Sequence, residues 1–362
     1  EEKIDGWLGS HDPVTPTVPR NHGGGESTHH LPVLLPTQPA KHTRAEIRIQ
    51  DGCDAFCTFC ILPRVRGAVR SKSVSDVIEE AQRLVDLGHK EIVLSGIFLG
   101  AYGHTTALRR KQRDTDARPL ADLLDAVASV PGLLRVRLSS LEPGDLTQEL
   151  LDAMVANSEV VAAHLHLPLQ SGSDRVLTRM NRQYRREQYV EAVAMATEQL
   201  RTIDGLPPAL TTDIICGFPG ETEHDFEQTC EVVEKARFLH MHVFPYSPRA
   251  GTASARWVHE QIDPKVSRQR VRYLIDREQD PINGLSLAYR QQLLNKRVRV
   301  IVEEQTANGV EGRCDHYVRI QLASDAARGT LVEASVTEVG PALTRAHATK
   351  SSLPLPILTS AI

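Results

Sequence analysis

Three cysteines stand close together in the segment CDAFCTFC, at Cys53, Cys57 and Cys60. The chain has six cysteines, so half of them fall in this one segment. Thiolates at this spacing can hold an iron–sulfur cube from a single loop, and one of its four irons then has no protein ligand. A cofactor or substrate can bind that iron, so the cluster predicts a site for chemistry. The alternative is a structural zinc site completed by a distant histidine.

Composition narrows the class of protein. The chain has 362 residues, 41% of them hydrophobic, and a formal net charge of −4. It contains no apolar run that could cross a bilayer and no signal-peptide pattern, so we expect a cytoplasmic protein in which clustered cysteines bind metal. The net charge argues against coating nucleic acid by bulk charge, and any RNA contact should be local. The chain begins at Glu1 rather than Met, and we interpret it as a fragment.

The pattern of apolar residues predicts an α/β protein with a partial (β/α)6 barrel followed by a small all-β barrel. Residues 1–43 are rich in proline and predict a linker, with 11–39 as an insertion. Strands are expected near residues 45, 91, 134, 163, 210 and 240, each followed by a helix or a turn. One of these helices should run from Ser73 to Leu87, before Gly88.

We therefore divide the chain into five parts by their sequence patterns. The linker is followed by the core barrel over 44–262, a helical connection over 263–293, a small barrel over 294–346 and a tail over 347–362. The helical pattern of the connection runs from about Pro264 to Leu294.

Unusual residues follow each expected strand of the core. They are Cys53, Ser95-Gly96, Ser140-Leu141-Glu142, Gln170-Ser171-Gly172, the segment 217–222 and the segment 246–249. In barrel-type α/β folds the loops after the strands converge on one mouth, which carries the active site. The sequence therefore predicts one site at the carboxyl ends of the strands.

The spacing C-x3-C-x2-C, with Phe59 before the last cysteine, resembles the signature of radical S-adenosylmethionine enzymes. The resemblance extends over about 44–255 and is to the methylthiotransferase family. Its segments are CDAFCTFCILPRVRG, LSG with LGAYG, SSLEP, HLHLPLQSGSD, MNRQY, DIICGFPGETEHDF and HVFPYSPRAGT. The barrel expected over about 294–345 is similar to the TRAM RNA-binding domain of that family.

The family has branches that differ in substrate. TTDIICGFPGET, MNRQY, HVFPYSPRAGT and LGAYG look most like the branch that modifies N6-threonylcarbamoyladenosine in tRNA. The branch that modifies N6-isopentenyladenosine in tRNA is the alternative. A zinc-stabilised RNA-binding protein without redox chemistry is a second alternative, of a different class.

The resemblance implies a transferase with a [4Fe–4S] cluster on Cys53, Cys57 and Cys60 and S-adenosylmethionine on the remaining iron. Reductive cleavage of this cofactor would give a 5′-deoxyadenosyl radical that takes hydrogen from C2 of the adenine 3′ to the anticodon, where a methylated sulfur replaces it. The implied partners are tRNA, a low-potential electron donor such as flavodoxin or ferredoxin, and a sulfur donor. No membrane is expected among the partners. A second [4Fe–4S] cluster is expected only in an N-terminal domain of which 1–43 would be a remnant.

The resemblance also implies contacts to S-adenosylmethionine, and it assigns no residue a catalytic role. The expected contacts are the backbone of Phe59 and of Gly217 to Pro219 to the adenine, Ser95 and Gly96 to the amino group, Glu142 to the ribose or amino group, and Arg182 to the carboxylate. From the sequence alone, Glu142 can equally be a surface acid. Arg182 can cap the helix near Met180 or pair with Glu187.

Histidines and cysteines elsewhere need no functional role. His164 and His166 alternate on one strand and face one side, so we expect packed or hydrogen-bonded histidines rather than metal ligands. The remaining cysteines, Cys216, Cys230 and Cys314, lie in apolar contexts and are expected to be small buried side chains.

Two groups of basic residues could contact phosphates or form ordinary solvated surface. Arg109, Arg110, Lys111 and Arg113 crowd the loop after the second strand, and Lys296, Arg297 and Arg299 open the small barrel.

Overall fold

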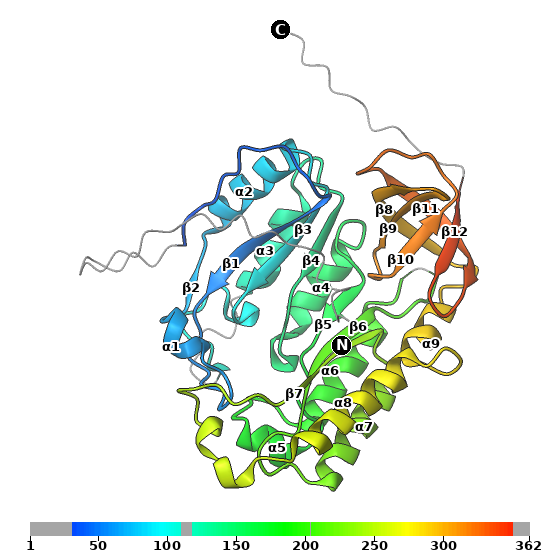
Figure 1. Ribbon diagram of the computed structural model, residues 1–362. Coiled ribbons are helices and arrows are strands. Elements are labelled where there is room, and N and C mark those ends of the chain that lie inside the picture. Colours follow the sequence, from blue (N-terminus) through cyan, green and yellow to red (C-terminus); the bar gives the residue numbers. More distant parts are fainter. Residues whose placement is uncertain (1–30, 110–117, 203, 350–362) are drawn as a thin grey trace.

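Six parallel strands form the core of the computed structural model, which describes residues 31–109, 118–202 and 204–349 (Figure 1). They are β1 (Arg44–Asp51), β3 (Glu91–Gly96), β4 (Arg135–Leu138), β5 (His164–His166), β6 (Ala209–Cys216) and β7 (His240–Pro245). Ladders join β1, β3 and β4 on one side and β5, β6 and β7 on the other, with short β2 (Arg70–Ser71) antiparallel to β1. Parallel bridges between Val136 and Val161 and between Ser140 and His166 connect the two halves. The six predicted strands and the partial barrel are confirmed.

Helices pack against the strands through one large apolar core. Helix α2 (Val74–Asp86) illustrates why they form where they do. Ser73 caps it by accepting a hydrogen bond from the Asp76 N–H at 3.1 Å, and Val77 and Ala81 bury one face against the sheet. The helix predicted over 73–87 is confirmed.

The other helices of the core follow the strands in the same manner. They are α1 (Leu62–Arg66), α3 (Pro119–Ala128), α4 (Gln148–Ala156), α5 (Asp174–Arg179), α6 (Arg186–Gln199) and α7 (Glu223–Ala236). Single 3₁₀ turns occur at η1 (Leu99–Ala101), η3 (Pro143–Asp145), η4 (Ser254–Arg256) and η5 (Val258–Glu260).

The helical connection differs from its prediction. Instead of one helical stretch, the chain forms α8 (Pro264–Gln279) and α9 (Leu285–Gln291). Pro281 cannot donate a backbone hydrogen bond, and a Cβ on Gly284 would lie 2.4 Å from the Asp280 carbonyl oxygen. The chain therefore turns sharply between two helices.

A closed five-stranded barrel follows, in the strand order β10-β12-β11-β8-β9. Its strands are β8 (Arg297–Thr306), β9 (Gly309–Cys314), β10 (Arg319–Leu322), β11 (Leu331–Val339) and β12 (Thr344–Ala348). Alternate residues such as Val298, Val300 and Val302 fill its interior. The small all-β barrel predicted from the sequence is confirmed.

The small barrel contacts the core where the parallel strands begin (Figure 1). Arg135 and Arg137, near the start of β4, donate hydrogen bonds to carbonyl oxygens of Arg299, Arg313, Cys314 and Asp315 at 2.6–3.1 Å. The small barrel thus lies at the amino-terminal edge of the sheet, opposite the edge that carries the cysteine loop. Among the residues described by the structure, no helix is both long and apolar enough to span a bilayer.

Candidate iron–sulfur and cofactor site

The cysteine loop begins directly after β1, and two residues fix its start. Gly52 has φ +81°, and a Cβ there would lie 1.9 Å from the Ala68 carbonyl oxygen, so only glycine fits. The buried side chain of Gln50 donates from Nε2 to the carbonyl oxygens of Asp51 and Gly52, at 3.0 and 2.8 Å. Its Oε1 accepts from the Phe98 N–H at 2.8 Å. Gln50 therefore ties the loop to the segment that follows β3.

The middle of the loop is held by two other segments. The Thr58 N–H donates to the Met180 carbonyl oxygen at 3.0 Å, and Asn181 Nδ2 donates to the carbonyl oxygens of Ala55 and Phe56. Ser254 donates from both its N–H and Oγ to the Thr58 carbonyl oxygen, at 2.9 and 3.0 Å. The loop is thus fixed between the α5–α6 turn and the segment after β7.

Burial makes two of the three cysteines, Cys53 and Cys57, poor thiolates until a metal binds. Cys53, Cys57 and Cys60 are free thiols and partly exposed. Burial raises the pKa of Cys53 to about 12, although the Ala55 N–H opposes the rise. Burial raises the pKa of Cys57 as well, against the effect of Arg182. Thiolate ligands must lose their protons, so coordination would replace protons by iron in this loop.

The donor set fits a [4Fe–4S] cluster chemically, since three thiols lie on one anchored loop. Across the described ranges, no group of three or more His, Cys, Asp or Glu side chains is arranged to hold one metal ion. An iron–sulfur cluster does not require its cysteines to converge on one ion, because each thiolate binds a different iron.

Arg182 joins the cysteine loop to a second predicted cofactor contact, Glu142. Its Nη2 lies 2.7 Å from Glu142 Oε1, and its Nη1 donates to Cys57 Sγ at 3.2 Å. Its Nε donates to the Tyr184 hydroxyl at 3.3 Å. Both Arg182 and Glu142 have side chains only 8% exposed. Glu142 is therefore not a surface acid, and Arg182 pairs with it rather than with Glu187.

A second arginine extends this network away from the loop. Arg109 Nη2 lies 2.9 Å from Glu142 Oε2, and its Nη1 lies 2.7 Å from Asp145 Oδ1. The other oxygen of Asp145 is buried and has no hydrogen-bond partner among the described residues. Burial raises the pKa of Asp145 to about 6, although Arg109 opposes the rise. Carboxylates and guanidiniums thus alternate from Asp145 through Arg109 and Glu142 to Arg182, which donates to the Cys57 thiol.

Ser95, Gly96, Phe59 and Gly217 lie around the same mouth but do not join this network. Ser95 Oγ donates to the Ile47 carbonyl oxygen at 3.4 Å, and Gly96 lies against Gln50. The Phe59 ring meets the Phe218 ring edge-on at a centroid distance of 6.5 Å, which brings Phe59 beside the segment from Gly217 to Pro219.

Packing against α8 requires a glycine at position 217. Its φ is +76°, and a Cβ there would lie 1.9 Å from Ser267 Oγ on α8. Its N–H donates to Glu221 Oε2 at 2.7 Å, and Glu221 in turn pairs with Arg270. The glycine is required by the approach of α8, whether or not a cofactor lies near it.

Most of the basic side chains expected to contact phosphates, where the structure describes them, bind other groups of the protein instead. Arg109 binds Glu142 and Asp145, while Arg110, Lys111 and Arg113 lie outside the described residues. Arg299 points back to the core, where it binds Asp315 and the Ser158 carbonyl oxygen. Lys296 donates to the Asp204 carbonyl oxygen, and Arg297 is 62% exposed beside it. Of these side chains, Arg297 keeps the accessibility that a phosphate contact needs.

The two histidines behave as predicted. His164 and His166 both contact Thr211 Oγ1, at 3.2 and 2.9 Å, and His166 Nε2 lies 3.3 Å from Asp213 Oδ2. The expectation of hydrogen-bonded histidines is confirmed.

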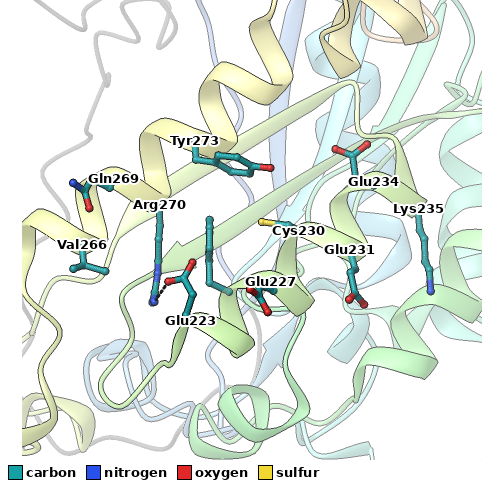
Figure 2. Close-up of a pocket in the computed structure, with 11 residues that line it drawn as sticks. Glu223, Glu227, Cys230, Glu231, Glu234, Lys235, Val266, Gln269, Arg270 and Tyr273 are labelled. Carbon is teal, nitrogen blue, oxygen red and sulfur yellow. Dashed lines mark hydrogen bonds and ion pairs between the residues drawn. The ribbon is translucent and has the colours of Figure 1, made fainter.

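The remaining cysteines follow their prediction in two of three cases. Cys216 and Cys314 are buried, as expected, but Cys230 is only partly buried. Cys230 lies on α7 and lines a groove of about 850 Å³ between α7 and α8 (Figure 2). Arg270 and Glu223 form an ion pair at 2.9 Å in this groove. The groove is on the helical outside of the barrel, away from the cysteine loop.

Sequence reasoning missed Gln50, Asn181, Tyr184 and Asp145. Gln50 ends a predicted strand immediately before the motif, and its polar character in an apolar strand was the available signal. Asn181 and Tyr184 flank Arg182 within MNRQY, so their position in a quoted motif could have drawn attention to them.

Comparison with known proteins gives the chain its family. The model of the radical SAM superfamily matches residues 47–233, more than half of the chain. The threonylcarbamoyladenosine tRNA methylthiotransferase MtaB of Bacillus subtilis is 37% identical over 304 residues, covering 82% of this chain and 63% of that protein. The tRNA-2-methylthio-N(6)-dimethylallyladenosine synthase of Alkaliphilus oremlandii is 38% identical over 308 residues, covering 84% and 61%.

Solved structures are more distant. The radical S-adenosylmethionine methyltransferase TsrM from Kitasatospora setae, with cobalamin and a [4Fe–4S] cluster bound, has a TM-score of 0.47 and 14% identity, covering 58% of this chain and 38% of that one. The chain spans less than two thirds of the length of the two sequence relatives. With its three-cysteine loop at the carboxyl edge of a partial barrel, the chain belongs to the radical SAM superfamily.

Proposed function

We propose that this chain is the radical SAM part of a tRNA methylthiotransferase that converts N6-threonylcarbamoyladenosine, 3′ to the anticodon, to its 2-methylthio derivative. The observation that carries the proposal is the anchored three-cysteine loop, with the Arg182–Glu142 pair 3.2 Å from Cys57. The two tRNA-modifying relatives support the substrate class.

Cys53, Cys57 and Cys60 would hold the [4Fe–4S] cluster. When bound, the cluster and S-adenosylmethionine supply one-electron cleavage chemistry that produces a carbon radical. The residues of this chain bind and orient. The guanidinium of Arg182, kept in place by Tyr184 and Glu142, suits a bidentate grip on the cofactor carboxylate.

Other residues around the same mouth would supply the remaining contacts. Glu142 suits a ribose or amino contact, and Ser95 with Gly96 suits the amino group. The Phe59 and Phe218 rings pack together in an apolar cluster, and the backbones of Phe59 and of Gly217 to Pro219 suit the adenine there.

The isopentenyladenosine branch remains the second candidate, because a relative of that name is as similar as the first. We propose further that the protein works in the cytoplasm with a low-potential electron donor of the flavodoxin or ferredoxin type and a separate sulfur donor. The second cluster expected for the family would belong to a part outside this chain.

Two measurements test the proposal. After anaerobic reconstitution the chain should be brown and bind S-adenosylmethionine with a spectral change, while Cys57→Ala should lose iron and Cys230→Ala should not. Colourless protein with one zinc would reject the radical enzyme in favour of the zinc-stabilised RNA-binding protein.

Mass spectrometry of tRNA nucleosides from a strain lacking the gene selects the substrate. Loss of 2-methylthio-N6-threonylcarbamoyladenosine, restored by the full-length gene, is expected. Loss of the 2-methylthio form of N6-isopentenyladenosine would select the second candidate, and an unchanged profile would reject both.

A further inference from the structure

Exposed phenylalanines occur in only two places. The chain has seven phenylalanines, and two of them are exposed, Phe56 at 59% and Phe244 at 51%. Phe56 lies in the cysteine loop after β1, and Phe244 lies near the carboxyl end of β7. β1 and β7 are the first and last of the six parallel strands. Both rings lie at the carboxyl ends of these strands, which is the edge of the barrel that carries the proposed site. Both exposed phenylalanine rings thus lie at the edge of the proposed site, which makes that edge a candidate binding surface.

Phe244 continues a row of rings along β7. The rings of His240 and His242 lie 4.5 Å apart, and the rings of His242 and Phe244 lie 6.4 Å apart at an interplanar angle of 10°. Residues two apart on a strand share one face, and the alternate residues Met241 and Val243 pack into the core between strands and helices. The row therefore faces the inside of the partial barrel.

Polar groups from the neighbouring strands face the same row. His166 of β5 has its ring 5.9 Å from that of His242. Asp213 is directly opposite His242 in the β6–β7 register and lies 3.3 Å from His166. The Asp213 side chain remains 30% exposed, so a solvent-reachable carboxylate lies on β6 opposite His242, two residues before Phe244 on β7. Burial lowers the pKa of His242 to about 4, which leaves its ring uncharged at neutral pH.

The row is linked to the cysteine loop through hydrogen bonds. Tyr246, two residues after Phe244, binds Ser254 through its hydroxyl at 2.9 Å. Ser254 donates to the Thr58 carbonyl oxygen between Cys57 and Cys60. The end of β7 that carries Phe244 is therefore joined by hydrogen bonds to the segment that would hold the cluster.

We propose that Phe244, backed by His242, is the platform on which an unstacked purine base of the RNA substrate lies, with Asp213 accepting a hydrogen bond from its exocyclic N–H. Bases of single-stranded RNA loops are recognised by stacking on aromatic rings and by hydrogen bonds to their edges. The inference rests on the proposed function and adds to it the surface that receives the base.

The test is a binding cycle on the reconstituted chain, kept anaerobic, with an anticodon stem-loop RNA and the same RNA made abasic at the target position. Stacking is worth about 1–3 kcal/mol per base, so Phe244→Ala should weaken binding of the intact RNA about 5- to 150-fold. It should leave binding of the abasic RNA unchanged. Phe244→Trp should restore binding of the intact RNA.

A matched control is Tyr273→Ala, which removes an equally exposed aromatic ring, 55% exposed, from the groove between α7 and α8. It should bind both RNAs like the unaltered chain. A second reporter is RNA with 2-aminopurine at the target position, whose fluorescence should be quenched by the unaltered chain and not by Phe244→Ala.

The failures of the two proposals can be told apart. If the unaltered chain distinguishes intact from abasic RNA and Phe244→Ala does so equally, the platform is wrong and the proposed function stands. If Phe244→Ala weakens both RNAs alike, the ring acts on something other than the base, and the inference is also overturned. If the unaltered chain binds neither RNA, the proposed function itself loses its support, and the platform with it.

Discussion

The guanidinium of Arg182 binds side chains from three segments of the chain. Glu142 follows β4, Cys57 follows β1, and Tyr184 comes two residues after the arginine. A buried guanidinium needs such a set of partners, because its five N–H donors and its charge are costly without them. The arginine therefore holds the acidic side of the mouth and the cysteine loop together before any cofactor is present.

Replacing Arg182 tests how much this contact contributes to the fold. Arg182→Met leaves Glu142 buried with Arg109 as its remaining partner, so stability should fall by about 3 kcal/mol, at the lower end of the cost of breaking a buried pair. Urea unfolding at neutral pH measures the change. Arg272→Ala is the control, because its ion pair with Asp276 is 78% and 61% exposed and should contribute less than about 0.5 kcal/mol. Equal midpoints for the two variants would contradict the role of Arg182.

Asp145 should give the protein a pH dependence opposite to that of most carboxylates. Its folded pKa of about 6 lies above the ordinary value of about 3.9, so the native state holds the proton more tightly than the unfolded chain. The stability from this group is complete below about pH 4 and is lost as the pH rises through 6. Asp145→Asn cannot titrate. The free energy of unfolding of the unaltered chain relative to this variant should therefore fall by about 3 kcal/mol between pH 4 and 7.

Urea unfolding of the two chains at several pH values checks this prediction. Only the difference between them is informative, because all other carboxylates titrate equally in both. Parallel profiles would mean that the Arg109 ion pair keeps Asp145 ionised.

The elements around the site depend on tight backbone approaches, of which Gly52 is the clearest. Gly52→Ala would place Cβ 1.9 Å from the Ala68 carbonyl oxygen at φ +81°, so the loop start must shift. We expect a loss of stability above about 2 kcal/mol and reduced iron content after anaerobic reconstitution, because Cys53 is the next residue. Thermal unfolding and iron analysis measure both.

Gly67→Ala is the matched control for this prediction. Gly67 also has positive φ, at +72°, but a Cβ there meets nothing within 4 Å. Its ψ of −147° makes this a conformation that glycine almost alone adopts, so Gly67→Ala should cost about 1–3 kcal/mol of backbone strain. It should keep the iron, because no atom has to move to admit the new Cβ. If both alanine variants behave alike, the approach of Ala68 is not what requires glycine at Gly52.

The elements could be predicted from the sequence, and their long-range contacts could not. The six strands and α2 carry local signals, such as the apolar spacing of Val77 and Ala81 after the Ser73 cap. Arg109 binds Asp145 from 36 residues away, and Gln50 binds Phe98 from 48 residues away. Such pairs depend on the distance between folded elements. For this reason Arg109 was expected on the surface, and Asp145 was not expected at all.

At the scale of the molecule, a buried cluster of charges fixes the small barrel to the core. Glu91 binds Arg44, Arg135 and Arg137, and these arginines hold its pKa well below its usual range despite burial. Tyr317 of the small barrel lies under the guanidiniums of Arg44 and Arg137. The small barrel is thus held at the edge opposite the cysteine loop, so an RNA that contacts both must extend along the side of the core.

Arg137 is the residue whose loss should separate the two bodies. It binds Glu91 Oε1 at 2.8 Å and donates to the carbonyl oxygens of Cys314 and Asp315 at 2.7 and 3.1 Å. Arg137→Met removes the side-chain donor to both carbonyls, although the Cys314 carbonyl keeps the Tyr317 N–H at 3.0 Å, and it leaves one charge of the cluster unbalanced. This change should cost the interface about 3 kcal/mol and leave the apolar interior of the small barrel intact.

Differential scanning calorimetry should then show two transitions for Arg137→Met where the unaltered chain shows one, because cooperativity between the bodies depends on their interface. Arg345→Ala serves as the control, since that arginine lies on the small barrel, is 49% exposed and binds only groups of the barrel itself. It should keep the single transition. A single transition at an unchanged midpoint in Arg137→Met would show that this arginine does not hold the barrel. The contact would then rest on the other groups at this interface, which include the Arg135 hydrogen bonds and the stack of Tyr317 on His164, at 4.6 Å between ring centroids.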